Sequence, residues 1–360
     1  MQLPAGRRKN STVGRALIDR DDVELCFELG WTDGLPVVPP TEERVERMLG
    51  AAAGRRHEVV AVLEPAGGEA TLENIAANAV MAGCLPQYLP VVVAAVRAVA
   101  EPEFWLELVV TCNEPTVPLV LVNGPLAREI GMNGDAGCLA GGNRANATIG
   151  RALSLVLRNV AGARSIREQE GDALEGTTIG HPGKISFCLT ENVEHSPWPE
   201  LSVERGLAPE QSAVTVFASD APVTTAEMSR TDPRLVCRTL AESMLAPGTL
   251  NSFYREDEIF LIMSPHHATV LAQAGWGRAE VQQSLFEQAR SPRSALRERG
   301  YDGMMSDLWP APWHSTDLDP VPIVAAPERF SIAVAGLPHC GLTSICFGFG
   351  KSVTVPIGAV

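Results

Sequence analysis

The sequence lacks the marks of a membrane or secreted protein. The longest apolar run, Leu89 to Ala100, contains Pro90 and Arg97 and is well short of the ~20 residues that a membrane-spanning helix requires. The basic residues at 7–9 are followed by no apolar segment of signal-peptide type. Only 5% of the residues are aromatic, so the core must be built mainly from Val, Leu, Ala and Ile. We therefore expect a cytoplasmic protein with no membrane partner.

Basic residues are also scarce. The chain has 29 Lys and Arg against 43 Asp and Glu, which gives a formal net charge of −14. A field of that sign repels nucleic acid unless a local basic patch offsets it. The basic clusters at residues 7–9 and 55–56 are short, so we expect no nucleic-acid partner. Hydrophobic residues at 45% and charged residues at 20% indicate a folded globular chain.

Standard catalytic and metal motifs are missing as well. The sequence contains no HExxH, no GxSxG and no paired CxxC, and the cofactor stays unknown. The cysteines are scattered, which is typical of reduced, mostly buried thiols rather than a disulfide framework. They are Cys26, Cys84, Cys112, Cys138, Cys188, Cys237, Cys340 and Cys346.

Strand-like and helix-like segments alternate along the chain. Strands are predicted over residues 57–63, 107–111, 117–122, 184–189, 213–218, 258–263 and 330–335. Helices are predicted over residues 21–29, 42–49, 71–83, 146–160, 233–245, 266–274 and 278–290, and from Pro86. This alternation predicts an α/β fold in which parallel or mixed sheets are flanked by helices.

The charge-rich and glycine-rich residues 167–183 separate two segments of similar rhythm. We interpret these segments as two Rossmann-like halves. The first α/β unit covers residues 13–170 and contains a glycine-rich loop. The second covers residues 171–360 and contains a Cys/Gly loop near its end. Residues 1–12 are predicted to be flexible, and residues 291–320 to form surface loops around one short helix.

The first glycine-rich loop runs from Asn133 into the strongest predicted helix. Its four glycines let the backbone approach a ligand closely, and the helix N-terminus offers N–H groups and a positive dipole end. The spacing matches neither the dinucleotide fingerprint nor the P-loop. We predict an anion site with Arg144 as a bidentate donor. The ligand-binding residues would be Gly141, Gly142, Asn143, Arg144 and Asn146. The simpler alternative is a tight turn in which Asn143 or Asn146 caps the helix.

The second glycine-rich segment, Gly336 to Lys351, follows the strand predicted over 330–335. Ligands in α/β sheets bind beyond the carboxyl ends of strands, so we expect this loop and residues 133–146 to face one cleft. Near imidazole, a loop thiol can be held partly as thiolate. The candidate catalytic residues are Cys340 as nucleophile, His339 beside it, and Cys346 as resolving thiol or metal ligand. The alternative is a structural turn with two ordinary cysteines.

Two histidines, His266 and His267, follow the strand predicted over 258–263. They could supply an acid/base group or metal ligands, although no metal is assigned. A helix capped by Ser264, with Pro265 at its first position, explains the turn without chemistry. Minor candidates lie at other element ends, where turn chemistry is the simpler explanation. They are Trp31–Asp33, Glu64, Cys84, Asn113–Glu114 and Glu191–Asn192.

Three stretches carry a resemblance. They are Trp31–Thr41 (WTDGLPVVPPT), Ile75–Cys84 (IAANAVMAGC) and Gly142–Arg151 (GNRANATIGR). Together they resemble an uncharacterised bacterial family associated with the UGSC-type thiol and selenoproteins. The resemblance implies thiol chemistry but no established reaction and no assigned catalytic residues. The Sec/Cys-Gly-Ser-Cys signature itself is absent, and the nearest string, His339 to Ser344, departs from it.

Three functions stay open. The leading hypothesis is an enzyme that acts on a small anionic metabolite, with loop 133–146 holding the anion and Cys340 as nucleophile or redox thiol. Its reaction would be that of a thiol-dependent lyase, transferase or hydrolase. The second is a metal-assisted lyase or hydrolase that uses His266 or His267 with His339. The third is a non-catalytic small-molecule binding protein. The sequence leaves the substrate open, and it also leaves open whether the protein forms a homo-oligomer.

Overall fold

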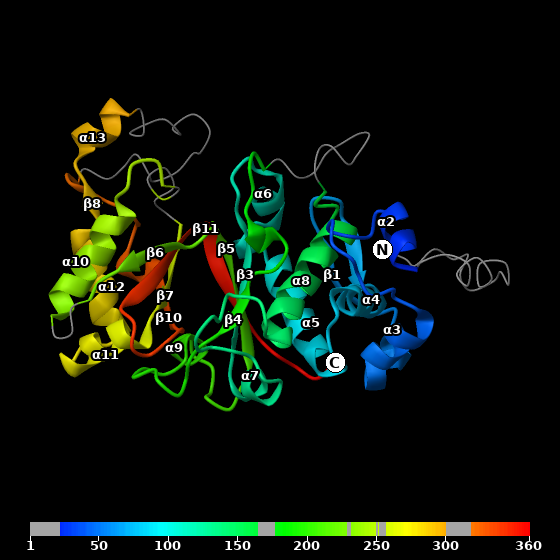
Figure 1. Ribbon diagram of the computed structural model, residues 1–360. Coiled ribbons are helices and arrows are strands. Elements are labelled where there is room, and N and C mark those ends of the chain that lie inside the picture. Colours follow the sequence, from blue (N-terminus) through cyan, green and yellow to red (C-terminus); the bar gives the residue numbers. More distant parts are fainter. Residues whose placement is uncertain (1–21, 165–176, 229–231, 250, 252–256, 300–317) are drawn as a thin grey trace.

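In the computed structural model a mixed β-sheet lies at the centre of the molecule, with helices beside it (Figure 1). The structure describes residues 22–164, 177–228, 232–249, 251, 257–299 and 318–360. The strands follow the order β10-β7-β11-β5-β3-β4, and β6 pairs with β11. Only the pairs β3–β4 and β7–β10 are parallel within this described sheet. The expected α/β class with a mixed sheet is therefore confirmed.

The strands of this sheet are β3 (Val117–Asn123), β4 (Cys188–Thr190), β5 (Ala213–Ser219), β6 (Val223–Ala226), β7 (Ile259–Met263), β10 (Phe330–Val334) and β11 (Leu342–Pro356). Two small antiparallel pairs lie apart from it. They are β1 (Val59–Leu63) with β2 (Gly68–Thr71), and β8 (Arg290–Ser291) with β9 (Val321–Pro322).

The helices form two groups, one at each end of the sheet (Figure 1). The N-terminal group comprises α2 (Asp22–Glu28), α3 (Glu42–Leu49), α4 (Leu72–Ala82), α5 (Leu89–Ala100), α6 (Leu106–Thr111) and α8 (Arg144–Asn159). The C-terminal group comprises α10 (Pro233–Met244), α11 (Pro265–Gln273), α12 (Arg278–Gln288) and α13 (Arg293–Glu298). Two short helices, α7 (Pro125–Glu129) and α9 (Leu201–Glu204), lie between the groups. No helix of the described residues is long and apolar enough to cross a membrane.

Two apolar cores lie on the two faces of the sheet. Alternate strand residues point to opposite faces, so Leu119 and Leu121 of β3 join the smaller core while Val120 and Val122 join the larger. The larger core includes side chains from most of the helices, with α9 and α13 as exceptions. The smaller core draws mainly on strand residues, and Phe217 stacks there on a ring from β7, Phe260, with centroids 4.0 Å apart. The sheet therefore packs helices on one face and its own strand side chains on the other.

One sheet joins the two predicted units. Strand β3 of the first unit pairs with both β4 and β5 of the second. The sheet's two edge strands are also linked, because the Asn192 N–H that follows β4 donates to Val334 O of β10 at 2.8 Å. The division near residue 170 stays a prediction, and it falls between neighbouring strands of one sheet. Residues 1–12 lie outside the described residues.

The strand predicted over residues 107–111 is wrong, because these residues form helix α6. Its buried residues are Leu106, Val109 and Val110, which follow the spacing of a helix face. Trp105, with φ of 56°, precedes the helix in the left-handed region. The short apolar run concealed this periodicity, because a run of six residues fits a buried strand equally well.

The C-terminal glycine segment is also largely different from the expected loop. Only residues 336–341 form a turn, and β11 begins at Leu342. Gly348 is required inside this strand, because a Cβ there would lie 2.0 Å from Ala218 O of β5.

The strand predicted over 184–189 is shorter than expected, since β4 begins only at Cys188. In the predicted loops from 291 to 320, α13 is the short helix, and residues 300–317 lie outside the described part.

Candidate functional site

Two asparagines fix the shape of the first glycine-rich loop. Asn143 is the N-cap of α8, and its Oδ1 accepts from Asn146 N at 3.0 Å. Asn146 is 3% exposed. Its Oδ1 accepts from Asn133 N at 3.0 Å, and its Nδ2 donates to Asn133 O at 2.8 Å and to Cys138 O at 2.9 Å. The capping interpretation of Asn143 is therefore confirmed, and the loop is held rigidly from within.

Arg144 lies at the first position of α8 and is directed toward the end of α4. Its Nε donates to Gly83 O at 3.0 Å. The neighbouring Cys84 Sγ donates to Thr148 O at 3.3 Å. Burial raises the pKa of the Cys84 thiol to about 12, although the side chain of Thr148 and the charge of Arg144 act in the opposite direction. Cys84 is therefore a protonated structural thiol at neutral pH.

A cavity of about 240 Å³ opens between the glycine loop, the first turn of α8 and residues 182–188. Gly141 and Asn146 line it, together with Ala147 and Ser186 among others. Close contact between α8 and the facing segment bounds the cavity. At Gly150 a Cβ would lie 2.6 Å from Ser186 Oγ, so only glycine permits this approach. Two of the five predicted loop residues, Gly141 and Asn146, thus line this partly open cavity.

The polar groups of this cavity are amides and a hydroxyl rather than thiolates. Ser186 Oγ donates to Ala147 O at 2.8 Å. Two cysteines line the cavity, Cys138 and Cys188. Burial raises the pKa of both thiols above the ordinary value, so both stay protonated at neutral pH. The cavity is suited to holding a small polar molecule more than to nucleophilic attack.

The turn at residues 336–341 presents the predicted thiol. His339 is exposed and Cys340 is partly exposed. Cys346, by contrast, is buried inside β11. Burial, together with the nearby charge of Asp220, raises the pKa of Cys346 to about 12, against a hydrogen bond with Ser219. This burial is evidence against Cys346 as an accessible resolving thiol or ligand.

A hydrogen bond joins the two glycine-rich loops, which were expected to face one cleft. Gly336 N donates to Gly134 O at 2.8 Å. Asn192, which follows β4, bridges them: its Nδ2 lies 3.1 Å from Gly336 O and 3.5 Å from Asp135 Oδ1. Neither His339 nor Cys340, however, is among the described residues that line the cavity. The structure therefore brings the loops together but places the thiol turn beside the cavity rather than in it.

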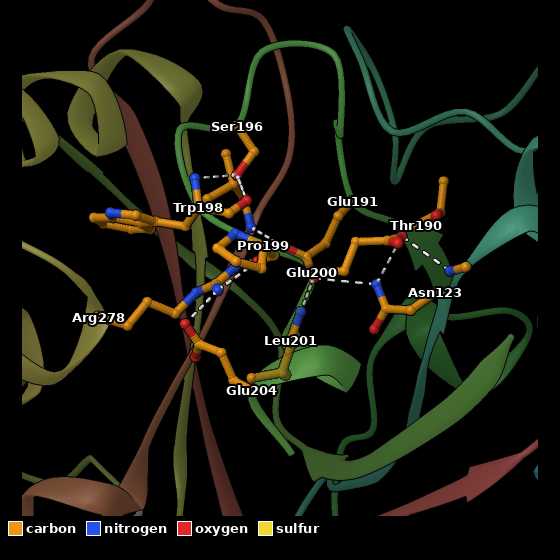
Figure 2. Close-up of polar contacts among 12 residues, drawn as sticks. Asn123, Thr190, Glu191, Ser196, Trp198, Pro199, Glu200, Leu201, Glu204 and Arg278 are labelled. Atoms are coloured by element: carbon orange, nitrogen blue, oxygen red, sulfur yellow. Dashed lines mark hydrogen bonds and ion pairs between the residues drawn. The ribbon is translucent and has the colours of Figure 1, made fainter. Parts of the chain in front are cut away.

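A buried ion pair holds this junction in place (Figure 2). Arg278 Nη2 lies 3.0 Å from Glu191 Oε2, and the two side chains are 2% and 1% exposed. Glu191 also accepts from Asn123 Nδ2 at 3.1 Å, Leu201 N at 2.6 Å and Val334 N at 2.9 Å. Burial raises the pKa of Glu191, while Arg278 and the two backbone N–H groups act in the opposite direction. The ends of β3, β4 and β10 are thereby tied to the start of α12.

Arg278 has further partners on the opposite side from Glu191. Its Nη1 lies 2.7 Å from Glu204 Oε1 and 2.6 Å from Pro199 O, and its guanidinium lies 5.4 Å from the ring centroid of Trp198 (Figure 2). In the sequence, Glu191–Asn192 was a minor candidate because it follows a predicted strand. Nothing in the sequence distinguished Arg278 from any other residue that begins a helix.

The two histidines of α11 have different environments. Ser264 caps the helix as expected, since its hydroxyl accepts from His267 N at 3.3 Å. His267 is fully buried, with Nδ1 2.8 Å from Thr343 Oγ1 and Nε2 2.8 Å from Glu227 O. Burial lowers its pKa. Both ring nitrogens are engaged, which leaves no lone pair for a metal in this arrangement. His266 is only partly buried.

Candidate metal ligands are dispersed in the described part of the chain. Among these residues no group of three or more His, Cys, Asp or Glu side chains is placed to hold a metal ion. The eight cysteines are all free thiols, six of them buried. The site consists instead of a cavity at the start of α8, an exposed thiol turn beside it, and a buried ion pair behind both. Comparison of the chain with protein-family models, curated proteins and solved structures finds no match.

Proposed function

We propose that this protein is an enzyme that binds a small anionic metabolite in the cavity at the N-terminal end of α8. The observation that carries the proposal is the cavity of about 240 Å³ that Gly141, Asn146 and Ser186 line together with other residues. Its size suits a small metabolite better than a nucleotide, because pockets for drug-sized ligands begin near ~300 Å³.

The N-terminus of helix α8 favours an anion in this cavity. α8 is 16 residues long, so its aligned peptide dipoles place positive potential at the cavity. The loop is already ordered by Asn143 and Asn146, and a preformed site loses less conformational entropy when a ligand binds. Both features favour an anion over a cation or a neutral ligand.

Thiol chemistry at Cys340 is the second candidate function. Cys340 and Cys112 are the two cysteines with partial exposure. Burial raises the pKa of Cys112, and its Sγ lies 3.8 Å from Glu114 O as a weak donor. Cys340 instead occupies an open turn whose first residue, Gly336, is hydrogen-bonded to the glycine loop. This hydrogen bond joins the turn to the loop, while Cys340 itself lies outside the cavity lining.

Thermal unfolding in phosphate and sulfate tests the anion site. With a dissociation constant near ~1 mM, about 10 mM phosphate should raise the Tm by roughly 2–4 °C relative to chloride at equal ionic strength. Ala147→Leu places a larger side chain in the cavity and should abolish the shift. Arg144→Ala, which removes a cation at the start of α8, should reduce it.

Arg47→Ala is the matched control, because Arg47 is an exposed arginine on α3 with an i,i+4 partner, Glu43. It should keep the full anion-dependent shift. The proposal is contradicted if phosphate gives no stabilisation, or if Ala147→Leu responds to phosphate as strongly as the unmodified protein.

A further inference from the structure

A second cavity, of about 230 Å³, lies further along α8. Ser154 and Arg158 of the helix line it, seven and eleven residues after Ala147, so they lie on the same side of the helix as the first cavity. Ile185 lines both cavities. The close contact at Gly150 lies between them along the helix. The groove between α8 and residues 182–188 thus contains two compartments.

An unsatisfied hydroxyl points to a ligand in the second cavity. Thr116, just before β3, lines the cavity and is 1% exposed. Its Oγ1 has no hydrogen-bond partner in the described structure. Buried polar groups in folded proteins are nearly always hydrogen-bonded, so each exception calls for an explanation. A polar ligand atom in the cavity would supply the missing partner.

The charged residues of the cavity favour an anion. Arg158 and Lys184 both line it. Among the described residues that line the cavity the acidic one is Asp33, and the Nε and Nη2 of Arg151 each lie 2.8 Å from one of its carboxylate oxygens. Although burial acts to raise it, the hydrogen bonds and charge of Arg151 hold the pKa of Asp33 below its ordinary value. Arg158 and Lys184 thus bring two cationic side chains to one cavity of a chain whose net charge is −14.

Most of the remaining wall is aliphatic. Val109 and Val110 of α6, Val117 of β3 and Leu157 of α8 line the cavity. These apolar side chains favour a hydrocarbon body over a sugar or a phosphate. At ~30 Å³ for each water-sized group, the volume accommodates roughly eight non-hydrogen atoms.

We propose that this second cavity binds a small aliphatic monocarboxylate of about four to six carbon atoms. Arg158 and Lys184 hold the carboxylate, the valines and Leu157 contact the hydrocarbon chain, and the Thr116 hydroxyl donates to a carboxylate oxygen. This site is independent of the anion cavity at the start of α8, because the two are lined by different polar residues.

Isothermal titration of the full-length protein with monocarboxylates from acetate to octanoate tests the proposal. The affinity should rise with chain length to about six carbons and then fall. 1-Hexanol, which has the hydrocarbon chain without the charge, should bind at least about tenfold more weakly than hexanoate. Thr116→Val should weaken hexanoate binding about fivefold, and Arg158→Met or Lys184→Met about tenfold.

The Tm of Thr116→Val and the binding of hexanoate to Ala147→Leu serve as controls. Thr116→Val removes an unsatisfied hydroxyl without changing the side-chain shape, so its Tm without ligand should equal or exceed that of the unmodified protein. Ala147→Leu blocks the first cavity and should leave hexanoate binding unchanged, which separates this proposal from the anion site. The proposal is overturned if no monocarboxylate binds below about 10 mM, if hexanol binds as well as hexanoate, or if Thr116→Val leaves the affinity unchanged.

Discussion

The two glycine-rich segments look alike in the sequence but differ in how they are held. The loop at residues 133–143 is organised from inside by Asn146, whose amide contacts the backbone of Asn133 and Cys138. The turn at residues 336–341 exposes His339 and partly exposes Cys340. A hydrogen bond between Gly134 and Gly336 joins the two. Glycine content therefore indicates close backbone approach, while buried side-chain amides decide whether a loop is rigid.

The support beneath each segment also differs. The turn at residues 336–341 packs against His267 and the backbone of Glu227. Its last residue, Gly341, approaches them so closely that an added Cβ would lie 3.1 Å from His267 Nε2 and 2.0 Å from Glu227 O. The turn therefore rests on a titratable group, whereas neutral amides hold the glycine loop. This contrast predicts a difference in stability, in pH dependence and in chemical reactivity.

The largest expected effect is on the anchored loop. Asn146→Ala leaves Asn133 N and the carbonyl oxygens of Asn133 and Cys138 without their partner, and it should lower the free energy of unfolding by about 3 kcal/mol. The matched change in the exposed turn, Cys340→Ser, should cost less than about 0.5 kcal/mol. Urea unfolding of both variants measures the difference. Equal losses would show that the two segments are held alike.

The second prediction concerns pH and the turn. Because burial lowers the pKa of His267 in the folded state, unfolding takes up a proton as the pH falls below about 6.5, and stability is lost in that direction. His267→Gln removes this proton uptake, so its stability should change less between about pH 5 and pH 7, by up to ~1.4 kcal/mol per pH unit.

Unfolding of both proteins by urea across this pH range isolates His267, because the other histidines contribute to both proteins. An asparagine side chain carries no titratable group, so Asn146→Ala should keep the pH slope of the unmodified protein. A His267→Gln slope equal to that of the unmodified protein would mean that His267 does not support the turn as described.

The third prediction concerns thiol reactivity. Cys340 should react with iodoacetamide at least about tenfold faster than the six buried cysteines, because access and thiolate fraction set the rate. Cys112 should follow, since it is partly exposed but its pKa is raised by burial. Timed labelling at neutral pH, followed by peptide mass spectrometry, gives each rate, with Cys340→Ser as control. If Cys340 reacts no faster than the average thiol, the turn is structural only.

The smallest expected effect is that of phosphate on the labelling of Cys340, which tests whether the glycine loop and the thiol turn form one site. Cys340 does not line the cavity at the start of α8, so about 10 mM phosphate should slow its labelling by less than ~2-fold. The same experiment on Ala147→Leu should show no effect of phosphate. Protection of about fivefold or more would place the thiol inside the anion site and remove the distinction between the two segments.

The sequence predicted the parts of the fold that depend on local pattern. The helix over 146–160 corresponds to α8 because its apolar residues repeat with helical period, and β5, β7 and β10 correspond to continuous apolar runs. The pattern failed for α6, where six residues are too few to reveal a period. It also failed for β11, whose glycines suggested a loop although Gly348 is needed for close strand pairing.

The candidate site was predictable only in part. Asn143 and Asn146 stand where caps and loop anchors are expected, and local spacing reveals them. Glu191 and Arg278 are 87 residues apart, so no local pattern connects them. Thr116 is an ordinary threonine in the sequence, and its unsatisfied hydroxyl appears only once α6, β3 and α8 pack around it.

The central claim is that the cavity at the start of α8 holds a small anion. The most direct test is a crystal structure of the protein purified in anion-poor buffer and then soaked in about 10 mM phosphate. The account predicts tetrahedral density between Ala147 and Ser186, within hydrogen-bond distance of backbone N–H groups near Gly141. Water alone in that cavity, in crystals where phosphate binds elsewhere on the protein, would contradict it.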